Sequence, residues 1–198
     1  MELRDFIVVD ESENGYSLVS LKEIFFHPQG GGQPCDKLLD KNGNAISVLK
    51  QGNEILLAVQ PNAIDNGRIE ITIDTEFRGL CSRLHSAGHL LALVVSELYK
   101  TEPVKAHHFP NECYVKFSGD IPKEFLTDIQ NILDKKILNN TSVTISDDDG
   151  NRFVNFDGIG GYPCGGTHVT ELQQIGDVLV GPITSKKGQT TIKYSLLN

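Results

Sequence analysis

Two pairs of residues in the sequence have the types and the spacing of metal ligands. His85 and His89 stand four positions apart in a segment of helical periodicity, which places both imidazoles on one helix face, about one turn apart. Cys164 and His168 are also four apart and flank two glycines, which let a loop fold tightly enough for the two side chains to converge. Because thiolate and imidazole suit zinc, the two pairs predict one Zn²⁺ site between a helix and a loop.

The composition of this ligand set favours hydrolysis. On its own, the histidine pair is more typical of the rim of a hydrophobic core, and the Cys164–His168 pair is what favours a metal site. Structural zinc sites are usually richer in cysteine, whereas three imidazoles and one thiolate leave the metal better able to polarise a carbonyl or a bound water. Ser86 occupies the position of the glutamate in the His-Glu-x-x-His motif, so a metallopeptidase of that kind would lack its general base. The residues therefore predict a hydrolytic site of another class.

Residues 1–74 are expected to form a small β domain. Runs rich in β-branched and aromatic residues alternate with the turn signals Asn14-Gly15, Asn42-Gly43 and Asn66-Gly67. Regular spacing of this kind predicts a small all-β barrel or sandwich, of which we expect the β-barrel-like form. The predicted strands are Phe6–Val9, Tyr16–Phe26, Ala45–Leu49, Glu54–Val59 and Arg68–Ile73.

Residues 75–198 are expected to form an α+β domain that contains both ligand pairs. The apolar period predicts one helix over Glu76–Tyr99 and a second helix that Pro122 opens, with Ile129 and Leu133 on its apolar face. Strands and helices mixed in this order are typical of the α+β class. The predicted strands are Val104–Phe109, Cys113–Phe117, Ser142–Ser146, Arg152–Phe156, Val178–Ile183 and Thr190–Leu196.

The overall composition restricts the partners and the compartment. Among 198 residues, 18 are Lys or Arg and 26 are Asp or Glu, a formal net charge of −8. Proteins that hold a duplex through many phosphates are usually basic, so we expect only a small contact with nucleic acid. The sequence has no long apolar run and no secretory signal, which predicts a cytoplasmic protein without membrane association. No obligate protein partner is evident from the sequence.

The motifs together resemble those of a known family. Pro163–His168, combined with the helical His-x3-His, resembles the editing domain of alanyl-tRNA synthetase and its free-standing relatives, the AlaX-type alanyl-tRNA editing proteins. Phe26–Asp36 resembles the glycine-rich motif that the longer free-standing forms carry in an N-terminal β domain. Asp74–His85 fits the family's run into the helix. The motifs occur in the family's order, and the resemblance covers most of the chain.

The resemblance implies a hydrolase that acts in trans. Such an enzyme would remove a wrong amino acid, chiefly serine and also glycine, from the acceptor end of mischarged tRNA(Ala). It would bind zinc through His85, His89, Cys164 and His168. Two other interpretations stay open: editing of a different mischarged tRNA, and a non-catalytic, zinc-stabilised tRNA-binding module.

Two motif residues are candidates for a part in catalysis. Gln33 would offer its amide to the substrate. Ser86, where the family often has Thr, would line the pocket and distinguish seryl from alanyl groups, or would only cap a helical carbonyl. The candidates for substrate binding are Gly30, Gly31, Gly32 and Thr167. For the glycine stretch the alternative is a turn that needs positive φ.

Basic residues suggest where the tRNA would be held. The candidates for phosphate contacts are Arg78, Arg83, Lys186 and Lys187, and the alternative is that they are scattered solubility charges. His107 and His108 are adjacent in a predicted strand, so their side chains point to opposite faces and do not easily share a metal. We expect these two histidines to be a solvated or interface pair.

Overall fold

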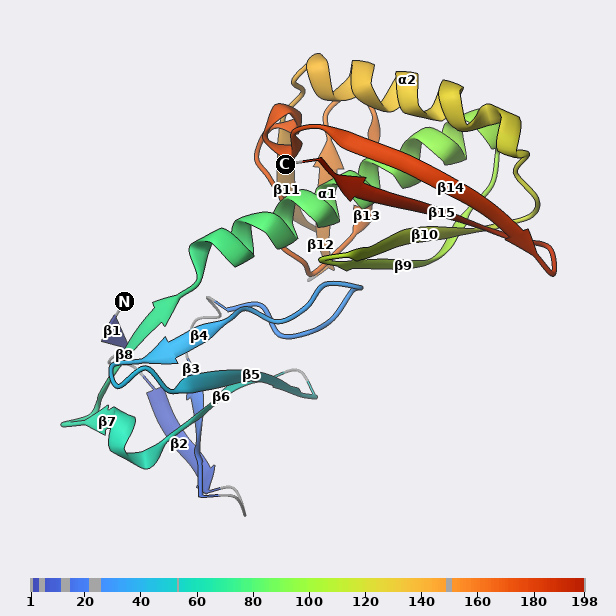
Figure 1. The fold of residues 1–198 in the computed structure, drawn as a ribbon. Helices are drawn as coiled ribbons and strands as arrows, with labels where there is room; N and C mark the ends of the chain where they lie inside the picture. The colour runs from blue at the N-terminus through green and yellow to red at the C-terminus, as the bar shows by residue number, and fades with distance from the viewer. Residues whose placement is uncertain are drawn as a thin grey trace. The chain divides into compact units, whose positions relative to one another are not determined.

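The chain folds into two compact units (Figure 1). The computed structural model describes residues 2–3, 6–11, 15–21, 26–52, 54–148 and 151–197. One unit comprises residues 1–30 and 34–78, and the other comprises residues 31–33 and 79–198. The expected limits of 1–74 and 75–198 stay a prediction. None of the helices in the described ranges has both the length and the apolar character that crossing a membrane requires.

The first unit is built on one antiparallel sheet. Its strands follow the order β1-β8-β4-β5-β6-β3-β2, with β7 paired to β8. Alternate side chains, among them Val19, Leu57 and Ile69, are fully buried and form the core of this unit. The strands are β1 (Glu2–Leu3), β2 (Phe6–Glu11), β3 (Ser17–Leu21), β4 (Leu38–Asp40), β5 (Ala45–Gln51), β6 (Glu54–Val59), β7 (Ile64–Asp65) and β8 (Arg68–Ile73), with a 3-10 turn at Pro61–Ala63.

The five strands expected before residue 74 are present, with different bounds in some cases. Of the expected strand Tyr16–Phe26, the structure shows Ser17–Leu21 as β3; Tyr16 and Phe26 are not in a strand, and residues 22–25 lie outside the described residues. The short strands β1, β4 and β7 were not predicted. At Asn66 and Gly67 the backbone has φ of 48° and 72°, as the Asn-Gly signal predicts for a tight hairpin turn. Asn14, in another predicted turn, lies outside the described residues.

The second unit mixes helices and antiparallel sheets, as the predicted α+β class requires. One sheet has the order β14-β15-β10-β9 and the other the order β11-β12-β13. Its elements are α1 (Thr75–Tyr99, from Gly79 onward in this unit), β9 (Pro103–Phe109), β10 (Glu112–Ser118), α2 (Leu126–Leu138), β11 (Val143–Asp148), β12 (Asn151–Phe156), β13 (Gly160–Pro163), β14 (Val178–Lys186) and β15 (Gln189–Leu196), with 3-10 turns at Lys123–Phe125 and Leu172–Ile175. No strand was predicted at the position of β13.

The core of the second unit forms where both helices meet the sheets. Leu91 and Val95 of α1 and Leu133 of α2 are fully buried in one cluster with Val115 of β10 and Ile192 of β15. The predicted apolar stripes of both helices therefore face the core, and the predicted helix Glu76–Tyr99 is confirmed. Burial of the apolar stripe of α1 fixes the turns of this helix that carry His85 and His89.

The glycine-rich segment 31–33 belongs to this second unit. Gly31 and Gly32 have φ of 57° and 79°, so the expected turn with positive φ is confirmed. The carbonyl of Gly32 accepts a hydrogen bond of 2.8 Å from the backbone N–H of His108. A Cβ at residue 32 would lie 2.8 Å from the carbonyl oxygen of Ala106, so only glycine fits against β9.

Candidate metal centre

The four predicted ligands come together in the second unit. His85 and His89 project from successive turns of α1, and Cys164 and His168 lie in the loop after β13. One ligand atom from each residue lies within 4.8 Å of the others. The centroids of the His85, His89 and His168 rings are 4.5 to 4.9 Å apart. This group could hold one metal ion.

Two separations within the group, both from Cys164, fit a small tetrahedral cation. Cys164 Sγ lies 3.4 Å from His85 Nε2 and 3.3 Å from His168 Nε2. In a tetrahedral zinc site with bonds of about 2.0 to 2.3 Å, neighbouring ligand atoms are about 3.3 to 3.7 Å apart. One thiolate and three imidazoles also match the donor preference of zinc.

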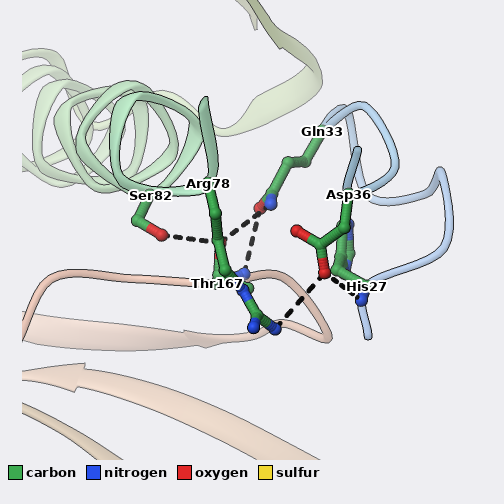
Figure 2. A network of polar contacts seen from close by, with 6 residues as sticks. All are labelled: His27, Gln33, Asp36, Arg78, Ser82 and Thr167. Carbon is green, nitrogen blue, oxygen red and sulfur yellow. Dashed lines mark hydrogen bonds and ion pairs between the residues drawn. The ribbon is translucent and has the colours of Figure 1, made fainter. Parts of the chain in front are cut away.

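Gln33 holds the imidazole of His85 and is itself held by Thr167. The side-chain oxygen of Gln33 lies 2.6 Å from His85 Nδ1. The same oxygen accepts the Thr167 backbone N–H at 3.0 Å (Figure 2). The Gln33 amide nitrogen and the Ser82 hydroxyl both donate to the Thr167 hydroxyl, at 2.8 and 2.7 Å. With Nδ1–H donated to Gln33, the tautomer leaves Nε2 as the ligand atom that faces Cys164.

Ser86 holds the imidazole of His168 in a similar way. The hydroxyl oxygen of Ser86 lies 3.0 Å from His168 Nδ1 and accepts the Val169 backbone N–H at 3.1 Å. Ser86 is fully buried on α1. It therefore ties the ligand-bearing loop to the helix, and leaves His168 Nε2 turned toward Cys164.

His89 carries an unsatisfied nitrogen in this group. Its Nδ1 is buried and has no hydrogen-bond partner within the described part of the chain. Burial also lowers the pKa of His89 to about 4, so the ring is neutral at pH 7, the form that binds metals. A buried polar atom without a partner costs free energy, and a bound cation would supply that partner.

Cys164 follows β13 directly and lies close to a backbone N–H and a guanidinium. Burial raises the pKa of its thiol, while the Gly166 N–H, 3.3 Å from Sγ, and the positive charge of Arg152 act in the opposite direction. Arg152 also donates a hydrogen bond to the Cys164 carbonyl. A Cβ at residue 166 would overlap the His85 ring, whereas one at residue 165 would meet nothing within 4 Å. The second glycine of the motif is therefore required for close approach, and the first is not.

The expectation of a solvated histidine pair is wrong for His108. His107 and His108 do point to opposite faces of β9, but His108 is only 1% exposed. Its ring is stacked on that of His85, with centroids 4.5 Å apart, and its Nδ1 lies 2.5 Å from the Tyr194 hydroxyl. Strand alternation predicts that two neighbours face opposite ways but not which face the helix covers, so His108 was missed as a neighbour of the site.

The other predicted residues are placed as follows. The Arg78 guanidinium lies 3.3 Å from the buried carboxylate of Asp36, which also accepts the His27 backbone N–H, both within the first unit (Figure 2). Arg83 donates to the Ile175 carbonyl at 2.9 Å. Lys186 and Lys187 are exposed at the β14–β15 turn.

The glycines of the motif differ in their surroundings. Gly31 lies near the His85 ring, whereas a Cβ on Gly30 would meet no atom within 4 Å. The structure thus brings Gly31, Gln33, Ser86 and Thr167 to the ligand group. Substrate binding by Gly30, Gly31, Gly32 and Thr167, and tRNA contacts by the four basic residues, stay predictions.

Known proteins support the resemblance seen in the motifs. The chain is 23% identical to alanyl-tRNA editing protein AlaX-L of Pyrococcus horikoshii, over 82% of this chain and 46% of that protein. It is 26% identical to AlaX-M of Saccharolobus solfataricus, over 90% of this chain and 88% of that protein. It is 21% identical to alanyl-tRNA editing protein Aarsd1 of Rattus norvegicus, over 91% of this chain and 49% of that protein.

The extent of these matches differs between relatives. The chain spans about half the length of AlaX-L and Aarsd1 and most of the length of AlaX-M. No family model matches the sequence. The similarity over most of this chain confirms its predicted resemblance to the AlaX-type alanyl-tRNA editing proteins.

Proposed function

We propose that the chain is a zinc-dependent deacylase that clears mischarged tRNA(Ala) in trans, acting chiefly on seryl-tRNA(Ala) and also on glycyl-tRNA(Ala). The observation that carries the proposal is the convergence of His85, His89, Cys164 and His168 within 4.8 Å. The relatives named as alanyl-tRNA editing proteins support the substrate class. Selection against serine needs such an enzyme, because one extra hydroxyl on a small side chain is hard to exclude by binding alone.

The four ligands would hold Zn²⁺ and leave catalysis without a carboxylate base. When bound, zinc would supply Lewis acidity for the ester carbonyl or for an attacking water. The ligand group contains no Asp or Glu. A hydroxyl of the terminal ribose, beside the ester, is then the group that shares the proton transfer.

Gln33 and Ser86 act on the ligands. Gln33 is 1% exposed and its amide oxygen and nitrogen are both engaged, with His85 and Thr167. Ser86 is engaged with His168 and Val169. We therefore assign both as positioning residues that fix the orientation and tautomer of two imidazoles. The predicted substrate contacts of these residues would need the hydrogen bonds to rearrange.

The direct test is deacylation of four substrates by the purified chain. We expect hydrolysis of seryl-tRNA(Ala) and glycyl-tRNA(Ala), and little hydrolysis of alanyl-tRNA(Ala) or of seryl-tRNA(Ser). Hydrolysis of seryl-tRNA(Ser) at a similar rate would favour editing of a different tRNA. Binding of tRNA without hydrolysis of any ester would favour the non-catalytic, zinc-stabilised module.

Ser86→Ala separates the two roles of Ser86. Loss of the hydroxyl releases His168 Nδ1 and the Val169 N–H, so we expect hydrolysis of seryl- and glycyl-tRNA(Ala) to fall alike, by about 10- to 100-fold. Ser86→Thr, which keeps the hydroxyl, is the control and should retain more activity. A loss confined to seryl-tRNA(Ala) would contradict the positioning role and would support the pocket role expected from the sequence.

A further inference from the structure

The four-stranded sheet of the second unit has an exposed face that the metal centre does not use. Strand alternation puts Cys113, Val115 and Ile192 on the buried face. The opposite side chains form what we call the outer face, and they are exposed or half-exposed. Its members are Lys105, His107 and Phe109 of β9, Glu112, Tyr114, Lys116 and Ser118 of β10, Gln189, Thr191, Lys193 and Ser195 of β15, and Leu179, Thr184 and Lys186 of β14.

The outer face is positively charged in a protein of net charge −8. The outer face carries four lysines. Among its described residues, Glu112 is the one acidic residue. Lys105 and Lys116 are direct cross-strand partners. Like charges opposite one another destabilise a sheet, so this pair does not serve the stability of the fold. A bound polyanion would relieve the repulsion.

Aromatic rings lie between the lysines. The rings of His107 and Phe109 are parallel, with centroids 4.2 Å apart, and the Tyr114 ring is stacked on His107 at 5.5 Å. Tyr114 is also the cross-strand partner of Lys193. Half-exposed rings can stack on bases, and the lysines that flank them can contact phosphates.

We propose that the outer face binds RNA, with the lysines on phosphates and the rings of His107, Phe109 and Tyr114 on an unpaired base. Naming the RNA as the substrate tRNA rests on the proposed function. His108, the neighbour of His107, points to the opposite face and stacks on His85. The segment bound on the outer face is therefore distinct from the aminoacylated terminal nucleotide.

The charge of the outer face also suits an anionic membrane, but its apolar content does not. Among the described members of the outer face, Leu179 is the one large aliphatic side chain, at 52% exposure. Aromatic rings stack on planar bases, whereas insertion among acyl chains needs a larger apolar surface. Binding to phosphatidylserine vesicles is the outcome that would speak for a membrane instead.

The test compares two triple variants that remove the same charge. Lys105→Ala/Lys116→Ala/Lys193→Ala strips the outer face, and Lys50→Ala/Lys123→Ala/Lys135→Ala removes three exposed lysines elsewhere. Affinity for uncharged tRNA(Ala) is measured between about 50 and 200 mM salt. We expect the outer-face variant to bind at least about tenfold more weakly and its salt slope to fall by about 2, because each phosphate contact contributes about 0.7 to 0.9. The control variant should keep the slope of the original chain.

Tyr114→Ala provides a second test, because it removes an aromatic ring without changing the charge of the protein. It should weaken tRNA binding by about tenfold and leave the salt slope unchanged, as loss of one stacked base predicts. Equal losses in the two triple variants would overturn the proposal. The proposal would also be overturned if the outer-face variant lost binding to the vesicles but kept its affinity for tRNA, while the control variant kept both.

The two proposals fail independently. Because the binding assay uses uncharged tRNA, it does not depend on hydrolysis. A chain that binds through the outer face but deacylates nothing would disprove the proposed function alone. A chain that deacylates seryl-tRNA(Ala), but whose outer-face variant binds like the control, would disprove the RNA surface alone.

Discussion

The two faces of the sheet β14-β15-β10-β9 are chemically opposite, and adjacent residues of β9 mark the difference. On the buried face, His108 contacts the Tyr194 hydroxyl, which donates to the Leu84 carbonyl of α1 at 2.9 Å. Burial lowers the pKa of His108 to about 3 and keeps it neutral. On the outer face, His107 is a quarter exposed and stacks on Phe109.

This contrast separates the face that supports the candidate metal centre from the face that we propose binds RNA. Substitutions on the buried face should change stability and, through His108 and His85, the ligand group. Substitutions on the outer face should change binding and leave stability nearly unchanged, because exposed side chains have water as an alternative partner.

The largest effect should come from Gly88→Ala on α1. A Cβ there would overlap the His108 ring and the Tyr194 hydroxyl, so we expect the free energy of unfolding to fall by about 3 kcal/mol. Gly79→Ala on the same helix is the matched control, since a Cβ at Gly79 meets no atom within 4 Å. It should stabilise the chain by about 0.5 to 1 kcal/mol. Urea unfolding measures both, and a neutral Gly88→Ala would contradict the tight contact.

Tyr194→Phe should have the next largest effect. It removes the hydroxyl that bonds to His108 and to the Leu84 carbonyl in a buried place, so we expect a loss of about 1 to 2 kcal/mol. Tyr114→Phe makes the same change on the outer face and should stay within about 0.5 kcal/mol. Thermal unfolding compares the pair, and equal shifts would remove the distinction between the faces.

The smallest effect concerns alkaline pH. Burial raises the pKa of Cys113 from 9.0 to about 11, and its thiol donates to the Phe109 carbonyl at 3.0 Å. The unfolded chain therefore loses this proton first, so the free energy of unfolding falls as pH rises from about 9 to about 11. Cys113→Ala should show a shallower fall over that range. An unchanged pH profile would show that this thiol does not contribute.

Local patterns were enough to predict much of the second unit. The apolar period of α1 extends over 25 residues, and its helix bounds differ from the prediction by one residue. The spacing of His85 and His89 follows from that helix. By contrast, β13 (Gly160–Pro163) is rich in glycine and has no strand pattern, and it forms through pairing with β12.

Contacts between distant residues could not be predicted in this way. Gln33 reaches Thr167 across 134 positions, and Arg78 meets the Asp36 carboxylate. Both contacts depend on how segments that are distant in the sequence pack against one another. The same holds for His108, whose burial follows from which face of the sheet α1 covers.

Metal content measured together with activity tests the central claim most directly. Elemental analysis and seryl-tRNA(Ala) deacylation are carried out on the same samples of the original chain, His85→Ala and Cys164→Ala, with Cys35→Ala, in the first unit, as a cysteine control outside the ligand group. We predict about one zinc per chain in the original and the control, and loss of both zinc and activity in the two ligand variants. Full zinc content or full activity in both ligand variants would contradict the account.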